Sequence, residues 1–153
     1  MVTKRSAGIV AYRIKKSVEV FLVHPGGPYF RNKDAGVWSI PKGEYTDEED
    51  PILAAKREFR EETGFEPSGI FVELQPVKQK SGKVVFAWAV QTDLDERNVI
   101  SNTFSIEWPP GSGKMKDFPE IDKAGWFTLE EAKEKINPAQ FKLIVELIEK
   151  LGI

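Results

Sequence analysis

Residues 50–64 constrain the fold more than any other stretch, because they carry signals for both ends of one helix. Asp50 is a residue type that caps helix N-termini, and Pro51 follows it at the first helical position. Gly64 stands where a helix commonly ends in a left-handed residue. The sequence therefore predicts a helix that begins after Asp50 and ends before Gly64.

The predicted helix has two different faces. With about 100° of turn per residue, an apolar stripe that should face the core is formed by Ile52, Ala55 and Phe59. A second stripe, within about 100° of arc, is formed by Glu58, Glu61 and Glu62. Carboxylates this close repel one another unless a cation lies among them. One reading of this stripe is an oxygen-ligand site for Mg²⁺ or Mn²⁺, and the alternative is an ordinary solvated acidic face.

The rest of the chain predicts strands followed by helices. Alternating or continuous apolar residues indicate strands over residues 7–14, 18–24, 37–40, 69–77, 83–92 and 98–108. Turn-forming residues predict loops over 25–36 and 109–120. The C-terminal stretch is helical in pattern, and Pro138 should separate a short helix from a longer one. We expect one α+β domain over residues 1–153, with helices packed on a sheet.

Composition excludes several classes of site. The chain has no cysteine and one histidine, His24, so a thiolate nucleophile, a cysteine zinc site and a multi-histidine site are excluded. Its net charge of −2 argues against general nucleic-acid binding. No apolar run approaches the roughly 20 residues of a membrane span, and the first residues lack the apolar core of a signal peptide. We expect a cytoplasmic protein whose metal is held by oxygen atoms.

The acidic helix and the loop before it resemble the Nudix box. The pattern is matched without a gap by Gly43, Glu49, Arg57, Glu58, Phe59, Glu61, Glu62, Gly64 and Phe65. The resemblance implies a Nudix fold, an α/β/α sandwich with a mixed sheet. It also implies hydrolysis of a nucleoside diphosphate linked to another moiety, with a divalent cation as cofactor.

The resemblance further implies roles for individual residues. Metal ligands would be Glu58, Glu61 and Glu62, together with the carbonyl of Lys42. Arg57 would hold a box glutamate in place, supported by Glu49, and Glu61 would activate the attacking water. Glu120 is a second candidate for a catalytic role, because it precedes Trp126 by six residues, where many Nudix enzymes have a loop glutamate.

The stretch "WSIPKGE", which includes Trp38 and Lys42, resembles the Nudix enzymes that act on dinucleoside polyphosphates such as diadenosine tetraphosphate. A lysine there could neutralise extra phosphate charge. The tyrosine that such enzymes commonly carry beyond the box is replaced by Ser-Gly-Lys at 81–83. The alternatives are an enzyme that hydrolyses ordinary or damaged (d)NTPs, and a catalytically silent module that binds nucleotides.

Other candidates for substrate contact are suggested by residue type and position. Tyr29 and Phe30 could stack on a nucleobase. Phosphate donors could come from His24, Arg31, Lys33 and Lys83, the last within a small basic group with Lys78 and Lys80. Lys114 and Lys116 lie in the long predicted loop 109–120, whose length suggests a lid or an interface. The expected partner is a small nucleotide, bound by a monomer or a homodimer.

Overall fold

β1 (Arg5–Ile14) is the central strand of the main sheet in the computed structural model, which describes residues 4–153. It pairs in parallel with β6 (Val84–Gln91) and antiparallel with β2 (Val18–Pro25). Residues 6–12 of β1 are all buried, because helices cover both faces of the sheet. The mixed sheet predicted from the sequence is confirmed.

The main sheet has seven strands in the order β4-β6-β1-β2-β9, with β3 and β5 beside this path. Besides the strands already given, it contains β3 (Lys42–Glu44), β4 (Val72–Glu73), β5 (Val77–Lys78) and β9 (Ile121–Thr128). Strand β3 pairs with the first part of β1, whereas β2 pairs with its last part. The box therefore starts on the sheet itself, beside β1.

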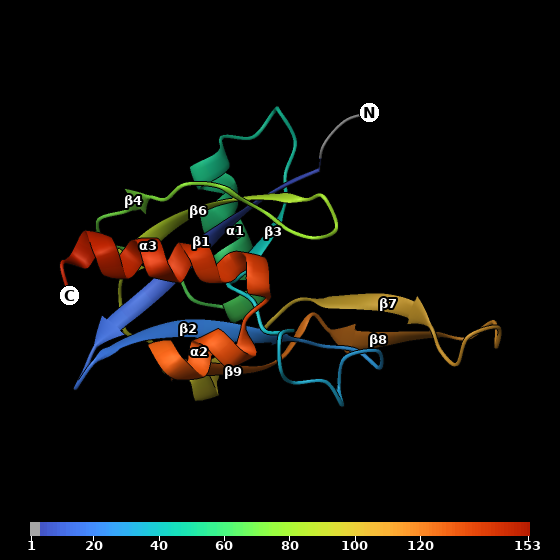
Figure 1. The fold of residues 1–153 in the computed structure, drawn as a ribbon. Coiled ribbons are helices and arrows are strands. Elements are labelled where there is room, and N and C mark those ends of the chain that lie inside the picture. Colours follow the sequence, from blue (N-terminus) through green and yellow to red (C-terminus); the bar gives the residue numbers. More distant parts are fainter. Residues whose placement is uncertain (1–3) are drawn as a thin grey trace.

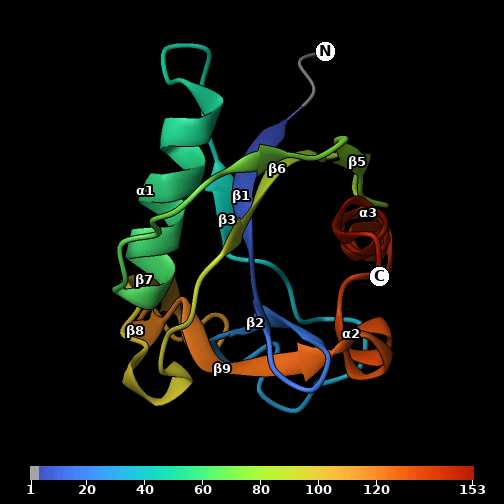
Figure 2. The ribbon, with the colours of Figure 1, turned by 90° about the vertical axis from the view of Figure 1, so that its left-hand side faces the viewer.

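Helices lie on both faces of the sheet. Figure 2 shows α1 (Pro51–Thr63) on one side, and α2 (Leu129–Lys135) and α3 (Phe141–Leu151) on the other. Buried side chains form two clusters: one between the sheet and α1, around Phe21 and Phe59, and one under α2 and α3. This arrangement confirms the expected α/β/α sandwich.

Hydrogen bonds and backbone angles confirm the predicted ends of α1. The Asp50 side chain accepts a hydrogen bond from the Ile52 N–H at 3.1 Å, and Pro51 is the first helical residue. Gly64 has a φ of 81° and its N–H donates to the Arg60 carbonyl at 2.8 Å. Both ends of the helix are therefore fixed. The helix in turn fixes the directions in which Glu58, Glu61 and Glu62 project.

Several sequence-based boundaries were wrong. The predicted loop 109–120 contains a strand, β8 (Met115–Pro119), which pairs with β7 (Thr103–Glu107) in a hairpin that projects from the body (Figure 1). The predicted strand 37–40 forms only isolated bridges, because Ser39 pairs with Val23 of β2 whereas Trp38 bonds to the backbone at the end of α2. The predicted strand 69–77 is split into β4 and β5, and β9 was not predicted.

Two short 3-10 turns complete the structure, η1 (Glu96–Asn98) and η2 (Pro138–Gln140). The second lies directly before α3, so Pro138 does separate the two C-terminal helices as predicted. Within the described residues, none of the helices has the length and apolar character needed to cross a bilayer.

Candidate active site

Three glutamates of α1 are held beside β3, each in a different environment. The side chain of Glu58 is 12% exposed, whereas that of Glu61 is 35% exposed. Glu62 accepts a hydrogen bond from the backbone N–H of Lys42 at 3.2 Å, which ties the helix to the start of β3. The acidic stripe of the helix is therefore not a freely solvated face, because it is turned toward the box loop.

Arg57 connects the acidic residues of the box. Its Nε and Nη2 donate to the two carboxylate oxygens of Glu49 at 2.7 and 2.9 Å. Its Nη1 donates to Glu58 at 2.8 Å and to both oxygens of Glu61 at 3.2 Å. These bonds, led by those to Glu49, raise the pKa of Arg57 above its ordinary value. The guanidinium therefore holds three carboxylates in fixed positions.

Glu120 lies close to the box glutamates, although it comes from a distant part of the chain. It follows β8 directly, and its backbone N–H donates to the Asn102 carbonyl at 2.8 Å. The Asn102 N–H in turn donates to the Glu61 carbonyl at 2.8 Å. Burial, and then the nearby Glu61 charge, raise the pKa of Glu120. The last turn of α1 and the loop before β9 thus converge on one place.

Burial and mutual repulsion disfavour the charged forms of the box carboxylates when no cation lies among them. Burial and then the neighbouring Glu58 raise the pKa of Glu62 to about 8, and burial also raises the pKa of Glu58. Among residues 4–153, no three Asp, Glu or His side chains are arranged as a ready-made metal cage. Mg²⁺ typically binds one or two carboxylates, waters and substrate phosphates, and this all-oxygen donor set fits such an ion.

Lys42 lies beside the carboxylates, and Lys83 lies near Lys42. Lys42, Glu62 and Glu120 line one small hollow of about 160 Å³. Burial and then the charge of Lys83 lower the pKa of Lys42. The ammonium of Lys83 is 3.6 Å from a Glu44 carboxylate oxygen. The structure therefore brings together two of the residues that the sequence suggested for substrate phosphates.

His24 and Trp38 occupy interior positions. The ring of His24 is fully buried, with Nδ1 2.6 Å from an Asp122 carboxylate oxygen and Nε2 2.6 Å from the Lys33 carbonyl. The indole N–H of Trp38 donates to Asp34 at 2.8 Å. Both residues therefore hold the 26–36 loop in place, and neither is placed to donate to a substrate phosphate.

The remaining candidates lie on the exposed turn 27–33. The side chain of Tyr29 packs edge-on against Trp108 of the hairpin, with ring centroids 5.5 Å apart. The Lys33 ammonium lies 5.5 Å from the centre of the Phe30 ring, and Arg31 is exposed. Sequence reasoning missed Trp108, although the alternation of Phe104, Ile106 and Trp108 signals one apolar face of a strand.

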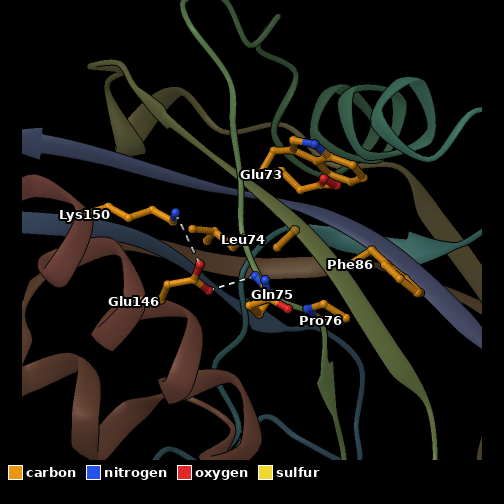
Figure 3. A pocket seen from close by; sticks show the side chains of 9 residues that line it. Glu73, Leu74, Gln75, Pro76, Phe86, Glu146 and Lys150 are labelled. Atoms are coloured by element: carbon orange, nitrogen blue, oxygen red, sulfur yellow. Dashed lines mark hydrogen bonds and ion pairs between the residues drawn. The ribbon is translucent and has the colours of Figure 1, made fainter.

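A second hollow lies away from the box. Figure 3 shows it between the β4–β6 edge and α3, with a volume of about 300 Å³. Glu146 accepts a hydrogen bond from the Gln75 N–H at 2.8 Å and lies 3.7 Å from the Lys150 ammonium. No box carboxylate lines this hollow. Its polar contacts fasten α3 to the chain between β4 and β5, so it is not the candidate active site.

Comparisons with known proteins identify the family and the fold of the chain. The NUDIX domain family model matches residues 2–147. A search of curated protein sequences gave no match. Among solved structures, the chain is similar to a C. elegans Ap4A hydrolase in a binary complex, with a TM-score of 0.69, 21% identity, and coverage of 96% of this chain and 98% of that one.

Two further structures have a similar fold. The NUDIX domain of Shewanella oneidensis NrtR, complexed with ADP ribose, has a TM-score of 0.65 and 14% identity, covering 100% of this chain and 90% of that one. A mutT/nudix family protein from Listeria innocua has a TM-score of 0.65 and 12% identity, covering 99% and 96% of the two chains. At these identities the similarity establishes the fold.

Proposed function

Because the chain belongs to the NUDIX family, whose hydrolases act on phosphoric anhydride bonds, we propose that it hydrolyses dinucleoside polyphosphates such as diadenosine tetraphosphate. The observation that carries this proposal is that Lys42 lines the same hollow as Glu62 and Glu120, with Lys83 close enough to Lys42 to lower its pKa. A long polyphosphate chain brings more negative charge than a divalent cation and Arg57 neutralise. Two further cations, Lys42 at the carboxylates and Lys83 near Lys42, suit such a substrate better than a short diphosphate.

Members of the family generally use divalent metal ions, and we propose Mg²⁺ as cofactor, with Mn²⁺ able to replace it. The residues that would hold it are Glu58, Glu61 and Glu62, with the Lys42 carbonyl as a further ligand. When bound, the metal would stabilise charge on the phosphate oxygens and lower the pKa of bound water. The raised pKa values of Glu58 and Glu62 support this assignment, because a cation between them would offset their repulsion.

The chain's own residues would orient the reacting groups. Arg57 would keep Glu58 and Glu61 in position while substrate binds. Lys42 and Lys83 would bind phosphate oxygens that do not react. Glu61 is our leading candidate for taking the proton from the attacking water, and Glu120 is the alternative because it lies close enough to Glu61 for that charge to raise the pKa of Glu120.

The proposal is tested by hydrolysis of a panel of substrates with Mg²⁺ or Mn²⁺, followed by chromatography of the products. The panel contains diadenosine tetraphosphate, ordinary and oxidised dNTPs, ADP-ribose and a diphosphoinositol phosphate. We expect the highest kcat/KM for diadenosine tetraphosphate, cleaved to ATP and AMP. A higher kcat/KM for dNTPs would favour a nucleotide-pool enzyme instead.

Two controls separate the substrate from the reaction class. Glu61→Gln should remove turnover of every substrate, because the ligand or base is lost whatever the leaving group is. Lys83→Ala should raise KM for the dinucleotide more than KM for a dNTP, because the longer chain has more phosphates to bind. Turnover of no substrate by the wild type would instead favour a module that only binds nucleotides.

A further inference from the structure

The β7–β8 hairpin carries an apolar face that the proposed reaction does not use. Phe104 and Ile106 alternate along β7, and Trp108 directly after it keeps the pairing by donating its N–H to the Lys114 carbonyl at 2.9 Å, so the three share one face. Phe118 lies opposite Phe104 in the register, with ring centroids 6.1 Å apart. All four side chains stay partly exposed, and no residue of either strand is buried. The hairpin thus presents aromatic rings outside either hydrophobic core.

This aromatic face rests on the turn that follows β2. A Cβ on Gly27 would lie 2.7 Å from the Phe104 ring, so the ring packs directly on the backbone there. Two residues further on, the Tyr29 ring meets Trp108 at 84°. Tyr29 is nevertheless 53% exposed and Phe30 is 38% exposed. The contact between turn and hairpin therefore leaves aromatic surface open to a ligand.

Backbone hydrogen bonds connect this surface to the acidic cluster. The Gly26 N–H donates to the Glu120 carbonyl at 2.8 Å. Because consecutive Cα atoms are about 3.8 Å apart, the Cα of Tyr29 lies no more than about 11 Å from that of Gly26. Tyr29 therefore lies on the same turn that is hydrogen-bonded to the backbone of Glu120, the loop acid of the candidate site.

The chemistry around the rings suits a nucleobase attached to phosphate. The ammonium groups of Lys33 and Lys116 lie 5.5 and 6.0 Å from the centres of the Phe30 and Phe118 rings. Flat π surfaces bind any base by stacking, and adjacent ammonium groups attract the phosphates attached to it. An apolar protein partner would offer no negative charge to these ammonium groups, whereas the phosphates of a nucleotide would. A nucleotide therefore fits this surface better.

We propose that the exposed ring of Tyr29, held in place by its edge-on contact with Trp108, forms the stacking surface for a nucleobase of the substrate, with Phe30 beside it. This inference rests on the proposed function and adds the part of the site that recognises the nucleoside. The hairpin then does more than carry Glu120 at its base, because its aromatic face places the base while the box holds the phosphates.

The test compares AMP with ribose 5-phosphate, which differ only in the base and contain no anhydride bond to hydrolyse. Dissociation constants are measured by calorimetry on the wild type and on Tyr29→Ala. We expect the wild type to bind AMP more tightly than ribose 5-phosphate. Tyr29→Ala should weaken AMP binding by about 5- to 150-fold, the range for loss of one stacked base, and should leave ribose 5-phosphate unaffected.

Two control variants and one further variant distinguish loss of base stacking from loss of protein stability. Tyr29→Phe keeps the ring and should bind AMP nearly as the wild type does. Met115 is 67% exposed and, as a neighbour of Lys116 in the strand, points to the other face of the hairpin, so Met115→Ala should change nothing. AMP should quench tryptophan emission in the wild type and quench it less in Trp108→Phe.

Each contrary result is distinct. Unchanged AMP binding in Tyr29→Ala, equal losses for both ligands, or equal affinity of the wild type for both would overturn the stacking surface. Hydrolysis of dinucleotides by the wild type would still leave the proposed function standing in these cases. If the wild type hydrolysed none of the nucleotides, the proposed hydrolase function on which this inference rests would be wrong.

Discussion

The backbone of Gly43 lies directly against the carboxylate of Glu58. A Cβ built on Gly43 would lie 2.1 Å from the carboxylate carbon and from one of its oxygens. Gly43 is the middle residue of β3, and Glu58 is the least exposed of the carboxylates that Arg57 contacts. The absence of a side chain at Gly43 therefore allows Glu58 to reach the sheet and turn toward the proposed metal position.

Gly43→Ala should displace the Glu58 carboxylate by an ångström or more, because the methyl group and the carboxylate cannot share the same space. Misplacing a reacting group by about 1 Å can lower the rate by about 100-fold, so we expect kcat to fall by about that factor. Steady-state kinetics at saturating metal measure the loss.

Gly125→Ala is the matched control, because the added methyl group meets only the Phe127 ring, at 3.2 Å, on a strand away from the box. It should keep kcat within a few-fold of the wild type. Equal activity of the two alanine variants would show that Glu58 does not need its observed position.

Arg57→Lys should lower the activity by about 10- to 100-fold, a typical cost for losing a residue that orients metal ligands. A lysine keeps the charge but cannot donate to Glu49, Glu58 and Glu61 at once. The variant should also require more Mg²⁺ for half-maximal activity, and a metal titration monitors this shift.

Arg60→Lys provides the comparison on the same helix, because Arg60 pairs with the exposed Glu66 at 3.2 Å. Its activity and metal requirement should match those of the wild type. If Arg57→Lys behaved in the same way, the guanidinium fork would not position the carboxylates.

The parts of the fold that were predicted correctly are those with local signals. Helix α1 has its cap, first proline and final glycine within its own sequence, and β1 and β2 are adjacent strands with a short turn. Strand β9 was missed because its state depends on β2, from which it is about a hundred residues distant, as in the pair Val20 and Phe127. The predicted loop 109–120 hid β8 because Pro109, Pro110, Gly111 and Gly113 lie before the strand and Pro119 ends it, so turn-forming residues flank the strand on both sides.

The residues of the candidate site also fall into those that local sequence predicts and those that depend on tertiary packing. The spacing of the box predicted the residues that Arg57 brings together on α1. It could not predict that His24 is buried, because its partner Asp122 lies 98 residues further along the chain. Nor could it place Lys42 near Lys83, since β3 and β6 meet only through β1. Residue type suggested phosphate contact for His24 and for the two lysines alike. Only the tertiary packing shows that His24 is in the interior whereas Lys42 is near Lys83.

Glu120→Gln tests the loop acid. If Glu120 takes a proton from the attacking water, kcat should fall by about 100- to 10,000-fold with little change in KM, because the amide cannot accept that proton. Glu61→Gln should be at least as severe, since Glu61 is also a proposed ligand. Glu130→Gln, an exposed position at the start of α2, is the control. A loss of only a few-fold in Glu120→Gln would leave the role of base to Glu61.

Asp34→Asn should lower stability at neutral pH and have less effect in acid. Asp34 accepts a hydrogen bond from the Trp38 indole and pairs with Lys135, and these contacts, Lys135 first, lower the pKa of Asp34 below 3.8. A lowered folded-state pKa contributes stability that is present above the unfolded-state pKa and is lost as pH falls through the folded-state pKa. The difference in Tm between Asp34→Asn and the wild type, measured from pH 7 downward, should therefore shrink below about pH 4. Glu130→Gln should show no such trend, and a difference that stayed constant with pH would mean that the charge of Asp34 does not stabilise the loop.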